Sequence, residues 1–190
     1  LINEENIGGN KMNVIVTIPP YAPYIRDVIN HPIVSGIRLN TVMPIQGKLE
    51  DTLKAISSHE KDIWIDLKYR QLRVQGHWIP PFTEIQLSHN IELDTTKPVT
   101  AYFSDGRQQA TILRQEKNKL YMQEGPKRMI GPGESLNIKH SSLKILGGLT
   151  KTDKEYLSVG KKLGLKNYML SFVENEKDAY ELLSHYPEAI

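Results

Sequence analysis

The stretch DIWIDLKYRQLRVQG, residues 62–76, decides how the rest of the chain is interpreted. Its first half contains the apolar run IWI, which is typical of a strand that is buried on both faces. Its second half gathers the charged residues Asp66, Lys68, Arg70 and Arg73. A chain that runs from a core into clustered charge either turns out into solvent or enters a binding site, and the flanking segments decide between these two interpretations.

The segments on both sides of this stretch predict a parallel sheet. Short apolar runs rich in β-branched residues alternate with segments whose apolar residues recur at helical spacing, which is the pattern of βαβ units. The helix after residue 150 has a further signal, because Thr152 and Glu155 have the spacing of a capping box. We expect strands at 13–20, 35–40, 63–68 and 167–173, and helices at 24–31, 48–60, 150–165 and 176–186.

Residues 77–141 break this alternation. They show no helical periodicity and instead form short runs of alternating or β-branched residues, separated by turn sequences such as KP, SDG, KN and GPG. Several short strands so close together indicate a small antiparallel β-barrel. The strands are expected at 84–93, 99–103, 109–115, 119–124 and 134–140.

The fold class that these patterns predict is therefore α/β with an all-β insert. Residues 1–12 are polar and rich in Gly and Asn, and we expect them to form a loose lead-in. Residues 13–76 and 142–190 are expected to form the α/β domain, and residues 77–141 the inserted β domain.

The composition is that of an ordinary globular protein. The 190 residues are 39% apolar and 24% charged, and the formal net charge of +2 is too small to argue for nucleic acid or an anionic membrane as a partner. No apolar run approaches the roughly 20 residues that span a bilayer, and the lack of cysteine fits a reducing compartment. We therefore expect a cytoplasmic protein with no membrane or nucleic-acid partner. Its oligomeric state is left open, with a homo-oligomer as one option.

Polar side chains follow the predicted strands at their C-terminal ends, where ligands bind in parallel α/β folds. Arg38 and Asn40 end the second strand, Asp66 ends the third, and Arg73 follows at the entrance of the insert. Two arginines suit an anionic substrate, since a guanidinium group binds phosphate or carboxylate oxygens in pairs. The oxygens of Asn40 and Asp66 suit a hard cation. The alternative, which the spacing leaves open, is an Arg–Asp ion pair that ties two neighbouring strands together.

The same residues carry a resemblance to the pyruvate kinase family. The family's ARLNFSHG resembles IRLNTVMP at 37–44, and its DTKGPEIRTG resembles DLKYRQLRVQG at 66–76. In the insert, DDGLISLQV is similar to SDGRQQATI at 104–112. Further along, LPAVSEKDIEDL and VDYIALSFVRSAEDV are similar to LGGLTKTDKEYL and LKNYMLSFVENEKDA, and the likeness keeps its order from about Asn13 to Tyr186. It implies a TIM-type (β/α)8 barrel, of which this chain holds part, with the β-barrel insert as a lid over the active site.

Site residues follow from the resemblance one by one. Arg38 matches the arginine that holds the phosphoryl group of phosphoenolpyruvate, which makes it the catalytic residue implied here. Arg73 matches the arginine at the nucleotide phosphates, so Arg38 and Arg73 are the expected substrate and nucleotide ligands. Asn40 and Asp66 match two ligands of the family's monovalent cation. The implied partners are a small phosphorylated metabolite and ADP or ATP.

The sequence departs from the family at several positions near these residues. Val42 and Leu67 replace a serine and a threonine that bind K⁺ in the family, Met43 replaces a histidine near the nucleotide, and Gln71 replaces a glutamate. The K⁺ site is therefore incomplete. The family's Lys-x-Glu and a following Asp, which supply the catalytic lysine and the Mg²⁺ ligands, are expected beyond Ile190, so we expect this portion alone to be inactive.

Two functions remain open for the full-length protein. The first is a pyruvate-kinase-like phosphotransferase of glycolysis, which converts phosphoenolpyruvate and ADP to pyruvate and ATP with Mg²⁺. The second is a catalytically degenerate relative that binds a phosphorylated metabolite or nucleotide, or acts as an interaction module. The order of the matching segments favours the enzyme, and the replaced cation ligands favour the second function.

Overall fold

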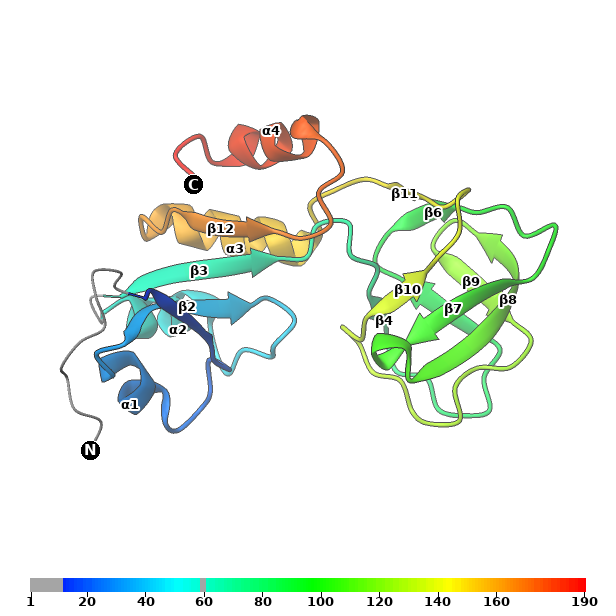
Figure 1. Cartoon of the computed structure of the whole chain (residues 1–190), viewed down its shortest axis with the longest axis horizontal. Helices are drawn as coiled ribbons and strands as arrows, with labels where there is room; N and C mark the ends of the chain where they lie inside the picture. The colour runs from blue at the N-terminus through cyan, green and yellow to red at the C-terminus, as the bar shows by residue number, and fades with distance from the viewer. Residues whose placement is uncertain (1–11, 59–60) are drawn as a thin grey trace.

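The computed structural model describes residues 12–58 and 61–190, so the predicted lead-in lies outside the described residues except for Met12. The chain forms two parts that lie side by side (Figure 1). One part is a parallel sheet with helices, formed by the N-terminal and C-terminal segments. The other is antiparallel and is formed by one continuous stretch in the middle of the chain, drawn green to yellow. The chain is thus a mixed α/β protein with a β insert, as expected.

Four strands and four helices form the parallel part: β1 (Val14–Thr17), α1 (Ile25–Asn30), β2 (Val34–Asn40), α2 (Leu49–Ser57), β3 (Asp62–Leu67), α3 (Lys151–Lys162), β12 (Asn167–Leu170) and α4 (Glu176–His185). The strands are parallel in the order β1-β2-β3-β12. Every strand and helix expected in these segments is present. The helix expected at 48–60 ends at Ser57, and residues 59–60 lie outside the described part of the chain.

A hydrophobic core lies between this sheet and its helices. Ile63, Ile65 and Leu67 of β3 are buried at alternate positions, and Leu53 and Ile56 of α2 belong to the same cluster. Full burial of an aliphatic side chain of this size stabilises a fold by about 1.5–3 kcal/mol. Because these residues anchor β3 in the core, they also fix the position of the polar residues at the C-terminal end of β3.

The capping box predicted for Thr152 and Glu155 is wrong, because the N-cap of α3 is Thr150 and its partner is Asp153. The Thr150 Oγ1 accepts a hydrogen bond of 3.1 Å from the Asp153 N–H, and the Asp153 carboxylate accepts one of 2.9 Å from the Thr150 N–H. Both pairs have the same spacing, and a tertiary contact decides between them. Asp153 is fully buried and also accepts hydrogen bonds from the N–H groups of the first two residues after β3. Asp153 thereby ties the start of α3 to the end of β3.

The antiparallel part contains β4 (Val74–Gln75), β5 (Glu84–Leu87), β6 (Asn90–Glu92), β7 (Val99–Phe103), the short 3-10 helix η1 (Ser104–Gly106), β8 (Gln108–Glu116), β9 (Lys119–Met122), β10 (Leu136–Ile138) and β11 (Lys144–Leu146). Six strands form a sheet in the order β10-β7-β8-β9-β5-β4, and β11 pairs with β6. The strand expected at 84–93 is divided into β5 and β6. Strands β4 and β11 were not expected, because runs of two and three residues are too short to show a period.

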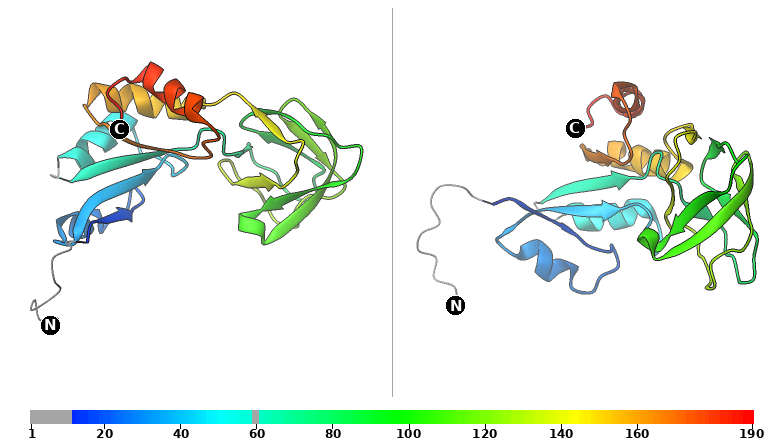
Figure 2. Two further views of the ribbon diagram at one scale, coloured as in Figure 1. Left: turned by 45° about the horizontal axis from the view of Figure 1, so that its top comes forward. Right: turned by 45° about the vertical axis from the view of Figure 1, so that its right-hand side comes forward.

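The first outer strand of the six-stranded sheet, β4, contacts the segment that leads into the other outer strand, β10. The Val74 N–H donates to the Glu134 carbonyl at 2.9 Å, and the Gly133 N–H donates to the Val74 carbonyl at 2.8 Å. The sheet therefore wraps around a second hydrophobic core that runs from Leu72 to Ile138, and Figure 2 shows its curvature from two further sides. The packing of the antiparallel part thus begins before residue 77. The segment after β3 is therefore held by the parallel part at its start and by the antiparallel part at its end.

The four parallel strands form an open sheet, so the eight-stranded barrel that the resemblance implies is not formed by the described residues. Ile190 pairs along the outer edge of β12: its N–H donates to the Lys166 carbonyl at 2.7 Å, and its carbonyl accepts from the Tyr168 N–H at 3.0 Å. Within the described part of the chain, none of the helices has the length and apolar character needed to cross a membrane.

Candidate functional site

A buried carboxylate stands at the C-terminal edge of the parallel sheet. Asp66, near the end of β3, is only 2% exposed. Its Oδ2 contacts the Arg38 guanidinium of β2 and lies 2.7 Å from the Lys68 Nζ. Its Oδ1 accepts a hydrogen bond of 3.0 Å from the hydroxyl of Ser171, which follows β12. Residues from three neighbouring strand ends therefore form one polar cluster.

This cluster has an excess of positive charge, because Arg38 and Lys68 share one carboxylate. The Arg–Asp ion pair that the sequence left open is present, and Lys68 adds a second cation to it. Burial lowers the pKa of Lys68 from its usual value of 10.5, while the hydrogen bond to Asp66 acts in the opposite direction. The ammonium group is thus incompletely compensated for its lost hydration. A bound anion would complete the compensation, so the cluster is suited to a negatively charged ligand.

Asn40 and Asp66 are paired residues of β2 and β3, so the two proposed ligands of a monovalent cation do lie side by side. The Asn40 Oδ1, however, accepts a hydrogen bond of 3.2 Å from the Val42 N–H, and both Asp66 oxygens have donors. The side chains of Val42 and Leu67 offer only carbon atoms. A monovalent cation here would also meet the charges of two cationic side chains. The residues present therefore do not fit K⁺. For a divalent ion, the described residues contain no group of three or more His, Asp or Glu side chains placed to hold it.

Arg73 lies at the entrance of the antiparallel part, and its guanidinium forms no ion pair with a carboxylate of the described residues. Its Nη1 donates to the Gly133 carbonyl at 3.0 Å, its Nη2 donates to the Gln71 side-chain oxygen, and its backbone N–H donates to the Ser88 hydroxyl at 3.1 Å. Its Nε is buried without a hydrogen-bond partner among the described residues. Burial lowers the pKa of the guanidinium, and the negative charges of Asp66 and Asp105 oppose this shift only in part. An anion close to Arg73 would therefore be stabilised.

A cavity of about 730 Å³ lies between the parallel sheet edge and the antiparallel part. Lys68 and Arg73 line it, together with Thr150, Lys151 and Thr152 at the start of α3, and with residues of the antiparallel part. None of the described residues that line it is Asp or Glu. Its volume is that of a typical small-molecule site. The predicted residues Arg38, Asn40 and Asp66 are not among the lining residues, and Lys68 links their cluster to the cavity.

Lys68 is the residue to which sequence reasoning gave no role. A signal was present, because residues two apart on a strand face the same side, which places Lys68 beside Asp66. The residue is 5% exposed, and its side chain reaches Asp66 and lines the cavity. Lys151 was missed for a different reason, since it lies far from Lys68 in the sequence and joins the cavity only through the packing of α3.

The chain leaves the sheet through Tyr69, which has a left-handed backbone with φ of 48°. Such a conformation favours glycine, and the family stretch DTKGPEIRTG has glycine at this position. The buried Tyr69 hydroxyl lies 3.0 Å from an Asp178 oxygen and 2.9 Å from a Glu181 oxygen of α4. Burial raises its pKa, so the hydroxyl keeps its proton and acts as a donor. Glu181 also accepts a hydrogen bond of 3.2 Å from the Leu149 N–H on the returning connection. Helix α4 therefore holds both connections between the two parts.

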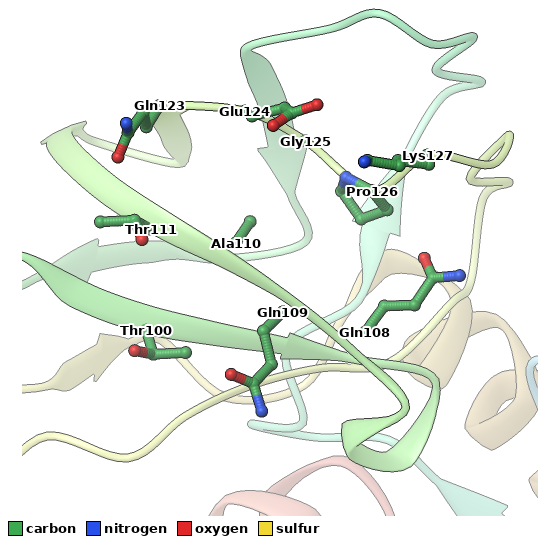
Figure 3. A pocket seen from close by; sticks show the side chains of 10 residues that line it. All are labelled: Thr100, Gln108, Gln109, Ala110, Thr111, Gln123, Glu124, Gly125, Pro126 and Lys127. Atoms are coloured by element: carbon green, nitrogen blue, oxygen red, sulfur yellow. The ribbon is translucent and has the colours of Figure 1, made fainter.

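A second cavity, of about 530 Å³, lies on the antiparallel part (Figure 3). Figure 3 shows Thr100 and Gln109 on the sheet, with Glu124 and Lys127 on the adjoining segment. Its lining is mostly amides and hydroxyls, with one acid and one base. The cavity at the sheet edge has three cationic side chains and no acid, so it is the better candidate for an anionic ligand.

Comparison with known proteins finds structures of similar fold, but no family whose sequence matches. The chain matches no known family's sequence profile and no curated protein. Among solved structures it is similar to pyruvate kinase of Cryptosporidium parvum in complex with ADP, with a TM-score of 0.63 and 17% identity over 95% of this chain and 42% of that one. A second structure of that organism's pyruvate kinase gives a TM-score of 0.65 and 17% identity over 93% and 44%. A third gives 0.62 and 18% over 94% and 42%. The resemblance expected from the sequence is thus confirmed as a likeness of fold, and this chain spans less than half the length of the pyruvate kinases that it matches.

Proposed function

We propose that this chain is the N-terminal portion of a pyruvate-kinase-like phosphotransferase, which transfers the phosphoryl group of phosphoenolpyruvate to ADP and yields pyruvate and ATP. The observation that carries the proposal is the position of the positive cluster. In a chain with this fold, Arg38, Lys68 and Arg73 gather at the strand ends, where active sites of parallel α/β folds lie.

The side chains described here would act by neutralising and orienting phosphate. In the reaction, the bond between phosphorus and the enol oxygen breaks, and a terminal β-phosphate oxygen of ADP forms the new bond to phosphorus. The released enolate takes up a proton at its methylene carbon and becomes pyruvate. Charge on the transferred group is spread over its oxygens, and fixed cations stabilise it. Arg38 would hold the phosphoryl group and Arg73 the nucleotide phosphates, while Asp66 keeps Arg38 and Lys68 oriented. Mg²⁺ would supply further charge neutralisation when bound, and its ligands are not among the described residues.

The antiparallel part would act as a lid over the cleft. Phosphoryl transfer to ADP must compete with transfer to water, and a closed lid excludes water from the reacting group. Arg73 and Ser88 of this part line the cavity, so a change in its orientation would change the shape of the phosphate site.

The proposal is tested by assaying the full-length protein with phosphoenolpyruvate, ADP and Mg²⁺. We expect pyruvate to form, and the Arg38→Ala variant to lose at least about a hundred-fold in turnover, as for other charge-stabilising groups at reaction centres. Arg107→Ala, which removes an exposed arginine of the insert, is the matched control and should leave turnover unchanged. A correctly folded full-length protein that forms no pyruvate would refute the enzyme.

A second candidate is a non-catalytic protein that binds a phosphorylated metabolite or nucleotide. It is favoured by the cation site, where Val42 and Leu67 offer no oxygen and the Asp66 carboxylate is already paired. Calorimetric titration with phosphoenolpyruvate and with ADP distinguishes the two functions from a pure interaction module. Binding without turnover supports the second candidate, and binding of neither ligand supports the interaction module.

A further inference from the structure

The cavity of about 530 Å³ on the antiparallel part lies beside a stretch of β8 that, within the described chain, has a partner strand on one side only. Residues 108–112 pair with β7, whereas the pairing of β8 with β9 begins at Ile112. One hydrogen bond continues on the β9 side, from the Gln123 N–H to the Thr111 carbonyl at 2.9 Å. Beyond it, the chain that follows β9 diverges from β8 (Figure 3). We call the space between residues 108–111 and residues 123–127 the β8 gap.

The residues that line the cavity place it in the β8 gap. Four consecutive residues of β8, 108–111, line it on one side with Thr100 of β7, and residues 123–127 line it on the other. Successive residues of a strand point to opposite faces of a sheet. A cavity above one face would therefore be lined by alternate residues of β8, whereas a cavity at its edge is lined by consecutive ones. The edge of β8 is thus accessible from the cavity.

The backbone N–H and carbonyl of Gln109 face the β8 gap. In an antiparallel sheet, both groups of one residue face the same neighbouring strand, and those of the next residue face the opposite one. The Thr111 carbonyl faces the β9 side, where it accepts from Gln123, so Gln109 faces that side too. Where β9 would continue, no described residue forms a backbone hydrogen bond with Gln109. The β8 gap therefore offers an unpaired donor and an unpaired acceptor of the main chain.

The side chain of Gln108 supplies a second, independent observation. Gln108 lies two residues before the buried Ala110, so its side chain is directed to the same, inner face of the sheet. Its Oε1 is buried and has no hydrogen-bond partner among the described residues. A buried acceptor without a donor is unfavourable. Because Gln108 lines the cavity, a donor that enters the β8 gap can satisfy this oxygen.

The chemistry of the β8 gap is suited to a peptide backbone. The charged residues that line it are one acid, Glu124, and one base, Lys127, so no sign of charge is favoured. None of the described lining residues is aromatic, so a planar ligand would find no stacking partner. An unpaired strand edge binds a further strand through main-chain hydrogen bonds, and an extended peptide carries both the acceptor and the donor that Gln109 needs.

We propose that the β8 gap binds an extended peptide segment of a partner protein, which adds to the edge of β8 at Gln109 as a short strand. Polar side chains of the peptide would lie beside Gln109 and Thr111 on the outer face, and small apolar ones beside Ala110 on the inner face. The residues of the gap are distinct from those of the proposed phosphate site, so this interaction is a function of the insert in addition to phosphoryl transfer.

The test uses the full-length protein and a fluorescently labelled synthetic peptide of alternating threonine and valine, blocked at both ends. Gln109→Pro removes the N–H that faces the gap and keeps the ladder to β7, since proline is tolerated at an unpaired strand edge. Gln109→Ala is the matched control, because it loses the same side chain and keeps the N–H. By fluorescence anisotropy, Gln109→Pro should weaken peptide binding at least about ten-fold and Gln109→Ala by less than about three-fold.

A second measurement needs no variant. The Gln109 amide of the wild type should exchange rapidly with deuterium in the free protein and more slowly with peptide bound, as followed by mass spectrometry of the fragment that contains it.

The outcomes decide the proposal separately from the enzyme. No binding at about 1 mM peptide, equal binding by Gln109→Pro and Gln109→Ala, or unchanged exchange at Gln109 would overturn it. Self-association of the peptide-free protein that Gln109→Pro abolishes, measured by sedimentation, would assign the β8 gap to a second copy of this chain and also overturn it. Pyruvate formation should be the same in Gln109→Pro as in the wild type, so failure of the peptide site leaves the proposed enzyme standing.

Discussion

Replacing Asp153 with alanine should destabilise the protein more than any other change at the start of α3. The carboxylate is fully buried and accepts four hydrogen bonds. The donors are the N–H groups of Lys68 at 2.9 Å, Tyr69 at 3.1 Å and Thr150 at 2.9 Å, and the Thr150 hydroxyl at 2.7 Å. Alanine leaves all of these donors without their acceptor.

The magnitude follows from the number of donors left unpaired. A buried donor without a partner costs about 1–3 kcal/mol, and loss of an N-cap interaction costs about 1 kcal/mol. The cost summed over the three unpaired N–H groups and the lost cap can exceed about 5 kcal/mol, but water that enters the site and local relaxation reduce it. We expect the free energy of unfolding to fall by about 3–5 kcal/mol for Asp153→Ala. Asp153→Asn keeps one oxygen acceptor and should lose about half as much.

Urea denaturation followed by circular dichroism measures these free energies. Glu155→Ala is the matched control, because Glu155 is exposed on the same helix and is the residue that the sequence pattern alone selected for the capping box. It should change the free energy of unfolding by less than about 0.5 kcal/mol. Equal effects of Asp153→Ala and Glu155→Ala would refute the tie between α3 and β3.

Three further changes test other contacts. Tyr69→Phe removes the buried hydroxyl that reaches the α4 carboxylates and should lower the free energy of unfolding by about 1–3 kcal/mol, measured by urea denaturation. Gly160→Ala should destabilise despite a gain of about 1 kcal/mol in helix propensity, because the new Cβ would overlap the Tyr168 hydroxyl oxygen; a higher melting temperature would contradict this contact. Burial alone would raise the pKa of Asp178, but hydrogen bonds from backbone N–H groups and Tyr69 lower it below its usual 3.8. The stabilisation that the Asp178 carboxylate contributes is therefore complete when the pH is above its usual pKa, and it is lost as the pH falls through the folded pKa. The difference in free energy of unfolding between the wild type and Asp178→Asn should shrink on acidification. A constant difference would contradict the shift.

Local patterns were enough to predict most of the fold. Apolar periodicity located the strands and helices of the parallel part, because these elements bury one continuous face. It did not reveal β4 and β11, which are too short for a period and depend on partners distant in sequence. It also selected Thr152 as the N-cap of α3 in place of Thr150, since the true cap depends on where the end of β3 packs.

The candidate site was predicted only in part, because local patterns show which residues end each strand but not how distant segments pack together. The strand ends placed Arg38 and Asp66 in contact, and Asn40 beside them, because the register of β2 and β3 is fixed by the sheet. The sequence did not show that Lys68 would share the Asp66 carboxylate, or that Lys151 would line the same cavity as Arg73. Those relations depend on side-chain directions and on the packing of α3. The roles of these residues in binding and catalysis stay predictions.

The central claim is that the cationic cleft binds phosphorylated ligands, and calorimetric titration of the protein with ADP and phosphoenolpyruvate tests it most directly. We predict saturable binding of each ligand with a Kd of about 1 mM or tighter, weakened at least about ten-fold by Lys68→Met, which removes the cation that links Asp66 to the cavity. Titrations in which neither ligand binds the folded protein, or in which Lys68→Met binds both as well as the wild type, would contradict the account.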